Sequence, residues 1–262
     1  MTTPCQRWRE QRASYRPAGE TIDPRRLCPT CGHPLQHDWF ACTGPETHHQ
    51  PFPKPVLYAS RTGTVRNLEA MAVAGIRLLA TPQQLHRYRD PVPPWAYMLD
   101  NGAFGAGGFD PAAFTKALHL LGQRADQIVL PDIVCGGHRS LLLSLAWLDL
   151  ALRVGPRVLI PVQDGMEESD LRPHLRHAQS QVGIFVGGST AWKEATMARW
   201  GRLAEEEACW MHVGRVNTPR RMALAVAAGA HSVDGSTATR FACRASYIAT
   251  AARQGDLLRI AS

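Results

Sequence analysis

The chain contains 262 residues, of which 45% are hydrophobic and 19% are charged. This is the composition of an ordinary globular protein, and it excludes a wholly disordered chain. No apolar run reaches the roughly 18 residues that span a membrane, and residues 1–12 lack the apolar stretch of a secretory signal. We therefore expect one large domain or two modest ones in the cytoplasm, away from membranes.

The net charge is +7, from 29 basic and 22 acidic residues, and only three of the basic residues are lysines. This arginine bias has two explanations. It reflects either a GC-rich genome or a polyanionic partner, because a guanidinium group binds phosphate through two parallel hydrogen bonds. The charge therefore permits a nucleic-acid partner without selecting one.

The first 50 residues differ in composition from the rest. Residues 1–26 hold six arginines with little apolar periodicity, which indicates a basic flexible arm. Residues 27–50 concentrate cysteine and histidine in the spacing of a zinc knuckle, and a complete set of four such ligands binds a structural Zn²⁺ ion. The expected ligands are Cys28, Cys31, Cys42 and His48, with His49, His37 and His33 as alternatives for the fourth.

From Val56 onward, short apolar runs alternate with amphipathic stretches. The expected strands are residues 56–60, 76–80, 96–99, 127–131, 157–161, 183–187, 209–213 and 231–234. The expected helices lie within residues 64–75, 111–123, 140–155, 191–208 and 218–230. Strands that alternate with helices form a parallel sheet, so residues 51–262 predict an α/β fold, a (β/α)8 TIM-type barrel that follows the small N-terminal zinc-binding segment. An open doubly wound sheet is the alternative, since residues 82–94 are less clearly helical.

Several expected helices carry boundary signals. Asp110-Pro111 and Thr218-Pro219 each place a capping residue before a proline in the first turn. Three of the expected helices end at Gly75, Gly155 and Gly229.

Polar residues follow most of the expected strands. The segments are Asp100-Asn101-Gly102, Pro131-Asp132, Gln163-Asp164-Gly165, Gly187-Gly188-Ser189, His212–Arg215 and Asp234-Gly235. The active site of such barrels lies at the carboxyl ends of the strands. A single aspartate there is usually a cap or turn residue, but aspartates at three separate strand ends suggest a site. Two carboxylates suit displacement at a sugar carbon, where one attacks C1′ and another exchanges protons with the leaving group.

Four segments, in chain order over about residues 56–245, resemble motifs of the tRNA-guanine transglycosylase superfamily. Residues 100–104 (Asp-Asn-Gly-Ala-Phe) look like the family's Asp-Ser-Gly-Gly-Phe, and residues 162–165 (Val-Gln-Asp-Gly) look like its Val-Gln-Gly-Gly. Residues 185–188 (Phe-Val-Gly-Gly) resemble its Ile-Gly-Gly-Leu region. Thr218-Pro219 and residues 233–240 resemble its segment from Thr-Pro to Phe-Asp and Pro-Thr-Arg.

This resemblance implies a base-exchange enzyme, a pentosyltransferase. Asp234 would be the nucleophile that forms a covalent enzyme–sugar intermediate, and Asp100 would be the general acid and base. Asp132 and Gln163 would hydrogen-bond the edge of the base. The remaining residues expected at the base are Gly187, Gly188, Asn101, and Phe104 and Met211 on its two faces.

The chain also departs from the family pattern. Asn101 stands in place of the family's serine, and Ala103 stands in place of its second glycine. The family's C-terminal zinc segment, which belongs to tRNA handling, has no match before Ser262. In these respects the chain is more similar to the phage-type deazaguanine DNA transglycosylases. The resemblance therefore implies exchange of guanine in DNA for a free 7-deazaguanine base of the preQ0 type, in a bacterial or phage-infected cytoplasm, with tRNA as the alternative substrate.

Two further interpretations come from other classes of protein. One is a catalytically inactive barrel that binds nucleic acid, although the presence of Asp234 favours an enzyme. The other is an unrelated hydrolase that holds a catalytic metal on His212, His231 and Asp234. Under the nucleic-acid interpretation, the expected contacts to the phosphate backbone are Arg215, Arg220, Arg221 and Arg240, whose alternative role is a solvated helix face.

The zinc set can be tested directly. We expect the purified chain to carry about one Zn²⁺ ion, because four deprotonated ligands bind zinc as the segment folds. Cys28→Ser or Cys42→Ser should remove the ion, as measured by elemental analysis, whereas Cys5→Ser should not. Full retention of zinc in both ligand variants would contradict the assignment.

Overall fold

The computed structural model describes residues 55–60, 64–87, 96–105, 107–177 and 181–236. The chain divides into two units, Met1–Pro53 and Lys54–Ser262, and every described residue belongs to the second. The expected zinc ligands, the basic arm and Arg240 therefore lie outside the described residues. Within the described ranges, no helix is both long and apolar enough to cross a bilayer.

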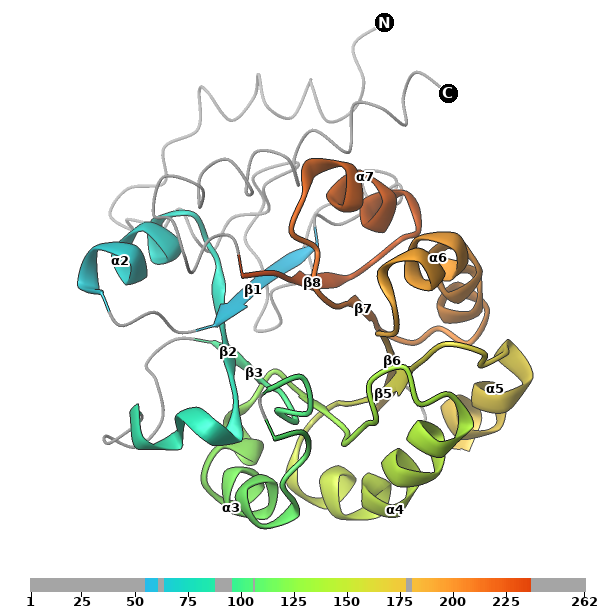
Figure 1. Cartoon of the computed structure of the whole chain (residues 1–262), viewed down its shortest axis with the longest axis horizontal. Coiled ribbons are helices and arrows are strands. Elements are labelled where there is room, and N and C mark those ends of the chain that lie inside the picture. The colour runs from blue at the N-terminus through green and yellow to red at the C-terminus, as the bar shows by residue number, and fades with distance from the viewer. Residues whose placement is uncertain (1–54, 61–63, 88–95, 106, 178–180, 237–262) are drawn as a thin grey trace, which may run out of the picture. The chain divides into compact units, whose positions relative to one another are not determined.

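Eight parallel strands close into a barrel in sequence order, as Figure 1 shows. This arrangement confirms the predicted barrel, and the open-sheet alternative is wrong. The ring is completed by β1 and β8, in which Tyr58 is paired with Asp234. The strands are β1 (Val56–Ser60), β2 (Arg77–Ala80), β3 (Tyr97–Leu99), β4 (Gln127–Val129), β5 (Val158–Val162), β6 (Val182–Val186), β7 (Met211–Val213) and β8 (Ser232–Asp234).

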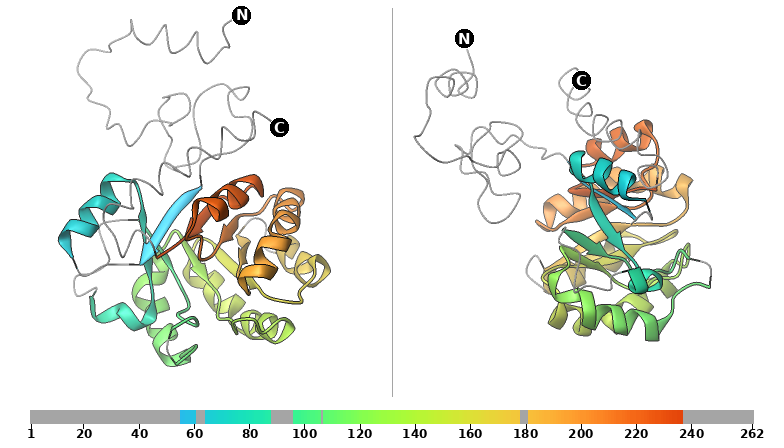
Figure 2. Two further views of the ribbon diagram at one scale, coloured as in Figure 1. Left: turned by 45° about the horizontal axis from the view of Figure 1, so that its top comes forward. Right: turned by 90° about the vertical axis from the view of Figure 1, so that its left-hand side faces the viewer.

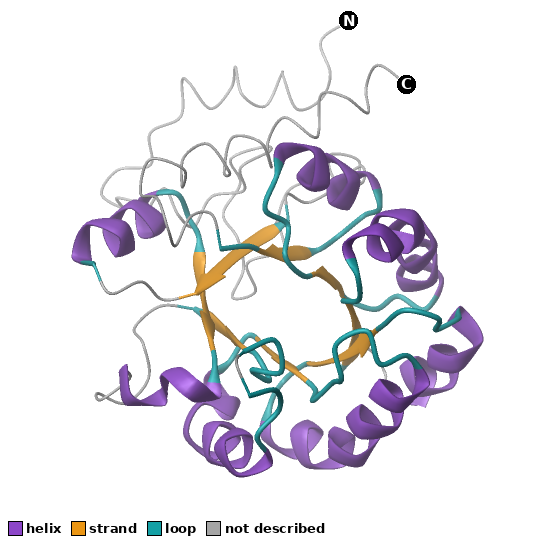
Figure 3. Cartoon of the chain, viewed as in Figure 1, coloured by secondary structure: helices purple, strands orange, loops and turns teal. Residues whose placement is uncertain are grey.

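Helices surround the ring of strands (Figure 3). The α-helices are α2 (Val65–Val73), α3 (Pro111–Leu121), α4 (His138–Val154), α5 (Glu168–His177), α6 (Thr190–Glu206) and α7 (Pro219–Ala227). Two 3-10 helices, η3 (Pro82–Arg87) and η4 (Gly122–Arg124), complete the described elements. The sequence did not predict α5, whose residues are mostly polar and include Pro173 within the helix.

The predicted caps are confirmed. The Asp110 side chain accepts hydrogen bonds from the backbone N–H groups of Ala112 and Ala113, at 3.0 and 3.1 Å. Thr218 accepts one from the N–H of Arg221 at 3.3 Å. These oxygens satisfy donors that have no partner within the first helical turn. Both helices therefore start where the sequence indicated.

Alternate residues of each strand face opposite sides of the sheet. One side packs against the helices and forms the larger apolar core, while the other fills the barrel interior (Figure 2). The buried residues of the interior cluster are Tyr58, Leu79, Met98, Val129, Leu159 and Trp210.

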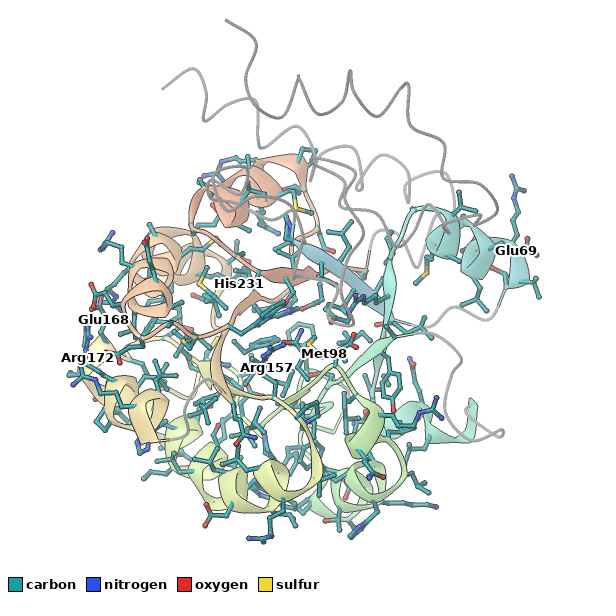
Figure 4. The ribbon with its side chains drawn as sticks, turned by 180° about the vertical axis from the view of Figure 1, so that it is seen from behind. Glu69, Met98, Arg157, Glu168, Arg172 and His231 are labelled. Carbon is teal, nitrogen blue, oxygen red and sulfur yellow. The ribbon has the colours of Figure 1, made fainter. Side chains whose placement is uncertain are left out.

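Charged and aromatic side chains close the amino-terminal end of the barrel. The Arg157 guanidinium lies 4.3 Å from the centre of the Trp210 ring, and His231 stacks on the same ring at 4.8 Å. Figure 4 shows Arg157 and His231 within the ring of strands, seen from this side. Nearby, Asp126 accepts hydrogen bonds from Arg77 and from the Tyr58 hydroxyl, each at 2.9 Å. Side chains fill this end of the barrel, so we look for a functional site at the carboxyl end.

Close packing of α6 on α7 gives a test of the fold. A Cβ atom at Gly201, inside α6, would overlap the carbonyl oxygen of Ala228. Glycine to alanine inside a helix normally stabilises it, but Gly201→Ala should instead lower the free energy of unfolding by about 1–3 kcal/mol, because the helices must separate. Chemical denaturation measures this change. Glu205→Ala, at an exposed site of the same helix, should stay within about 0.5 kcal/mol of the original protein.

Candidate active site

Three carboxyl groups meet at the carboxyl end of the barrel. Asp100 follows β3, Asp132 lies beyond β4, and Asp234 ends β8. Their proximity affects Asp100 most. Burial disfavours its charged form, and the negative charges of Asp234 and Asp132 add to this effect, so the pKa of Asp100 rises to about 7. A carboxyl group with this pKa can give and take a proton near neutral pH.

A chain of amides holds Asp132 in place. The Asn101 amide donates to Oδ1 of Asp132 at 2.9 Å and to the carbonyl oxygen of Leu130 at 2.5 Å. On the other side, the Gln163 amide donates to Oδ2 of Asp132. Burial raises the pKa of Asp132 to about 6, although both amide bonds favour its charged form. The structure thus brings together Asp132 and Gln163, expected at the edge of the base, with Asn101, also expected at the base.

Two glycines form the wall next to this chain. A Cβ atom at Gly187 would lie 2.6 Å from the amide nitrogen of Gln163. Gly188 has a φ of +76°, and a Cβ atom there would press on Asp164 and Trp192. Asp164 in turn accepts a hydrogen bond from the N–H of Ser189 at 2.7 Å. The backbone at Gly187 and Gly188 therefore lies closer to Gln163, Asp164 and Trp192 than a residue with a side chain would allow.

Both oxygens of Asp234 have hydrogen-bond partners. Nε2 of His212 lies 3.0 Å from Oδ1, and the backbone N–H of Arg215 donates to Oδ2 at 3.2 Å. His212 is fully buried, and its ring stacks on Phe185 with the two centres 4.9 Å apart. Asp234 itself keeps 9% of its surface accessible. Asp234 is therefore fixed in place by its hydrogen bonds and still accessible to a substrate.

Arg215 covers part of the mouth. Its guanidinium lies 4.5 Å from the centre of the Phe104 ring and donates to the carbonyl oxygen of Gly188. Phe104 is 65% exposed, which is unusual for a large apolar side chain. Arg215 also has a φ of +57°, a conformation that costs a non-glycine residue about 1–3 kcal/mol. The loop after β7 is therefore held in a strained form over the site.

Lys193, on α6, holds the loop that follows β7. It lies in the first turn of α6, is almost fully buried, and donates to the carbonyl oxygen of Gly214. Burial disfavours the ammonium ion, and the charge of Arg215 adds to this, so the pKa of Lys193 falls to about 8. Sequence reasoning missed Lys193, although a lysine on the apolar face of an expected helix is a usable signal.

Other expected residues lie elsewhere. Met211 packs in the core between the sheet and the helices, whereas its neighbour His212 faces the barrel interior. The structure therefore does not bring Met211 to the carboxylates. The side chains of Arg220 and Arg221 both bind Glu194, at 2.5 and 2.9 Å. Three of the arginines expected to contact nucleic acid lie within the described residues, and of these only Arg215 reaches the mouth of the barrel.

The suggested metal set of His212, His231 and Asp234 does not assemble. His231 stacks on Trp210, which packs with the interior cluster, and its Nδ1 accepts a hydrogen bond from the N–H of Met211 at 3.0 Å. More broadly, no three histidine, cysteine or acidic side chains within the described part of the chain are grouped to hold a metal ion. These donors do not fit a catalytic metal at the mouth.

Comparison with known proteins does not assign the chain to a family. The chain matches no protein-family model, and no curated protein is significantly similar to it.

The raised pKa of Asp100 predicts how stability depends on pH. An unfolded aspartate ionises near pH 4, whereas folded Asp100 ionises near pH 7. Between these values the folded state binds more protons, so its stability falls as the pH rises. Asp100→Asn removes this loss of stability, because an amide does not ionise. Its stability relative to the original protein should therefore increase by about 2 kcal/mol between pH 5 and pH 8.

Urea denaturation at the two pH values measures the difference. The control is Asp149→Asn, which changes an exposed carboxylate on α4 and should have the same small effect at both pH values. An Asp100→Asn variant whose relative stability does not change with pH would show that Asp100 is ionised throughout.

Proposed function

We propose that the protein is a base-exchange transglycosylase, which replaces guanine in DNA with a 7-deazaguanine base through a covalent aspartyl–sugar intermediate. One observation carries the proposal. The strand ends that resemble transglycosylase motifs contribute Asp100, Gln163 and Asp234 to one barrel mouth, where Asp132 joins them, and the carboxyl groups there are electrostatically coupled. DNA is favoured over tRNA by the resemblance to the phage-type enzymes alone.

The first half of the reaction suits this division of roles. Asp234, held by donors to both oxygens, attacks C1′ while the bond from C1′ to the guanine nitrogen breaks. Asp100, whose pKa of about 7 leaves much of it protonated at neutral pH, gives its proton to the departing base. The products are a sugar ester of Asp234, a neutral guanine and an ionised Asp100.

The second half reverses these steps. The incoming base loses a proton to Asp100 as its nitrogen attacks C1′, and the ester bond to Asp234 breaks. Retention of configuration follows, because each of the two displacements inverts C1′. The nucleic-acid backbone stays intact throughout, since the sugar remains bound to the enzyme between the steps.

Recognition of guanine suits the hydrogen-bond chain beside these carboxylates. A guanine edge offers N–H donors and a carbonyl acceptor. Asp132 supplies acceptor oxygens, and the Gln163 amide has a second N–H besides the one bound to Asp132, which supplies a donor at the same place. A target base in a duplex must leave the stack to reach this position. Phe104, exposed at the rim, offers a face on which that base can stack.

The experiment uses the full chain with duplex DNA, single-stranded DNA and tRNA, each labelled in guanine. Addition of free 7-deazaguanine bases should release label from DNA. A denaturation-resistant adduct should form in the original protein and be lost in Asp234→Asn. Asp100→Asn should slow turnover by roughly 10²–10⁴-fold, the range for general acid–base catalysis. It should leave DNA affinity nearly intact, because phosphate contacts dominate that affinity.

The matched control is Asp126→Asn, which alters a carboxylate at the opposite end of the barrel and should leave exchange unchanged. Exchange on tRNA but on none of the DNA substrates would reverse the choice of substrate. Binding without release of label, in all three substrates and with a range of free bases, would favour the non-catalytic binding barrel.

A further inference from the structure

A hydrogen-bond chain runs through the barrel interior and ends at Asp234. It begins at Ser232 and passes through the His212 ring, whose Nδ1 lies 2.8 Å from the Ser232 hydroxyl oxygen. Nε2 of the same ring lies 3.0 Å from Oδ1 of Asp234. His212 and Ser232 are fully buried, so these contacts are shielded from water.

The Ser232 hydroxyl determines which nitrogen of His212 carries a proton. A hydroxyl has one proton to donate and two lone pairs to accept with. The Trp210 indole N–H, which can only donate, bonds the Ser232 oxygen at 2.8 Å, and the Gln127 amide N–H bonds it at 3.2 Å. Both lone pairs are then used. The Ser232 proton must therefore point at Nδ1 of His212, which acts as an acceptor.

We propose that His212 is a neutral positioning residue, protonated on Nε2, which donates to Asp234 and holds it as the anion that the reaction needs. The need for an anionic Asp234 rests on the proposed function, whereas the tautomer follows from the hydrogen bonds in which the Gln127 amide N–H is directed at Ser232. An imidazolium would need a third acceptor site on Ser232, which has none left. His212 is therefore a fixed donor and takes no part in proton transfer.

The orientation of the Gln127 amide matters to this argument. With its N–H directed at Ser232, the Gln127 Oε1 atom is buried without a hydrogen-bond partner among the described residues. In the opposite orientation its oxygen would take the Ser232 proton, and Nδ1 of His212 would have to be the donor. A neutral ring would then face the carboxylate of Asp234 with a bare Nε2 at 3.0 Å, so that orientation requires a ring protonated on both nitrogens. The ring spectrum described below separates this cationic ring from the neutral one.

The donor matters because three carboxyl groups share the mouth. Negative charge is costly there, as the raised pKa values of Asp100 and Asp132 show. A donor on Oδ1 lowers that cost at Asp234 specifically, since hydrogen bonds to the charged form favour it. The Phe185 ring stacked on His212 fixes the direction of the donor.

The first test concerns the tautomer and needs no activity. Nitrogen-15 spectra of the histidine rings at pH 7 should show His212 neutral, with Nε2 protonated and Nδ1 bare. Assignment comes from the signal that His212→Gln removes. Ser232→Ala should shift the Nδ1 signal, because it removes the only donor to that atom among the described residues. Thr196→Ala, a part-buried hydroxyl on α6, should leave the signal unchanged. A cationic ring, or one protonated on Nδ1 only, would overturn the inference.

The second test separates positioning from folding. His212→Gln keeps a donor near the position of Nε2, whereas His212→Phe keeps the ring stack and removes the donor. With both variants folded by circular dichroism, His212→Phe should form the covalent adduct roughly 10²-fold more slowly, the usual cost of a misplaced reacting group. His212→Gln should recover most of that rate, and DNA affinity should match the original in both.

Equal adduct rates in His212→Phe and the original protein would also overturn the inference. The two proposals can fail separately. If the original protein forms no adduct on any nucleic acid but shows the expected ring spectrum, the proposed function fails while the assigned tautomer stands.

Discussion

The pairing of β8 with β1 is the interaction on which the rest of this structure depends. It closes eight parallel strands into a ring and places Asp234 beside Tyr58, at opposite ends of the described chain. In a closed parallel barrel all strands run the same way, so their carboxyl ends share one rim. Asp100, Asp132 and Asp234 therefore meet there although long stretches of chain separate them. Without closure, Asp234 on β8 would lie at the far edge of an open sheet, away from Asp100 and Asp132.

That convergence creates an electrostatic problem which the surrounding groups resolve unequally. Each carboxyl group is at least partly buried, and each raises the cost of charge on its neighbours. Asp132 receives two amide donors and Asp234 has the His212 ring and a backbone N–H as partners, whereas Asp100 has only backbone donors among the described residues. Burial and the charges of Asp234 and Asp132 raise the pKa of Asp100 to about 7, above the value of about 6 for Asp132. Similar side chains thus acquire different roles from their surroundings.

The two ends of the barrel differ in how firmly they are packed. Arg157, Trp210 and His231 stack into a filled floor, and a hydrogen-bond chain rises from the Trp210 indole through Ser232 and His212 to the mouth. At the rim, by contrast, Phe104 is exposed and Arg215 is held in a strained conformation. The filled floor thus orients Asp234, while the rim keeps an exposed ring and a strained loop.

The sequence by itself determined the kind, number and order of the strands, whose expected ends differ from the observed ones by at most two residues. Apolar periodicity is local, so it is readable without coordinates. It also indicated the carboxylates, because they follow the strands directly. It missed α5, whose polar residues and Pro173 carry no such signal. Only the tertiary structure decided that His212 faces inward and Met211 outward, and that Glu194 occupies Arg220. Burial, charge coupling and hydrogen bonds join residues distant along the chain, so they exist only once the barrel has closed.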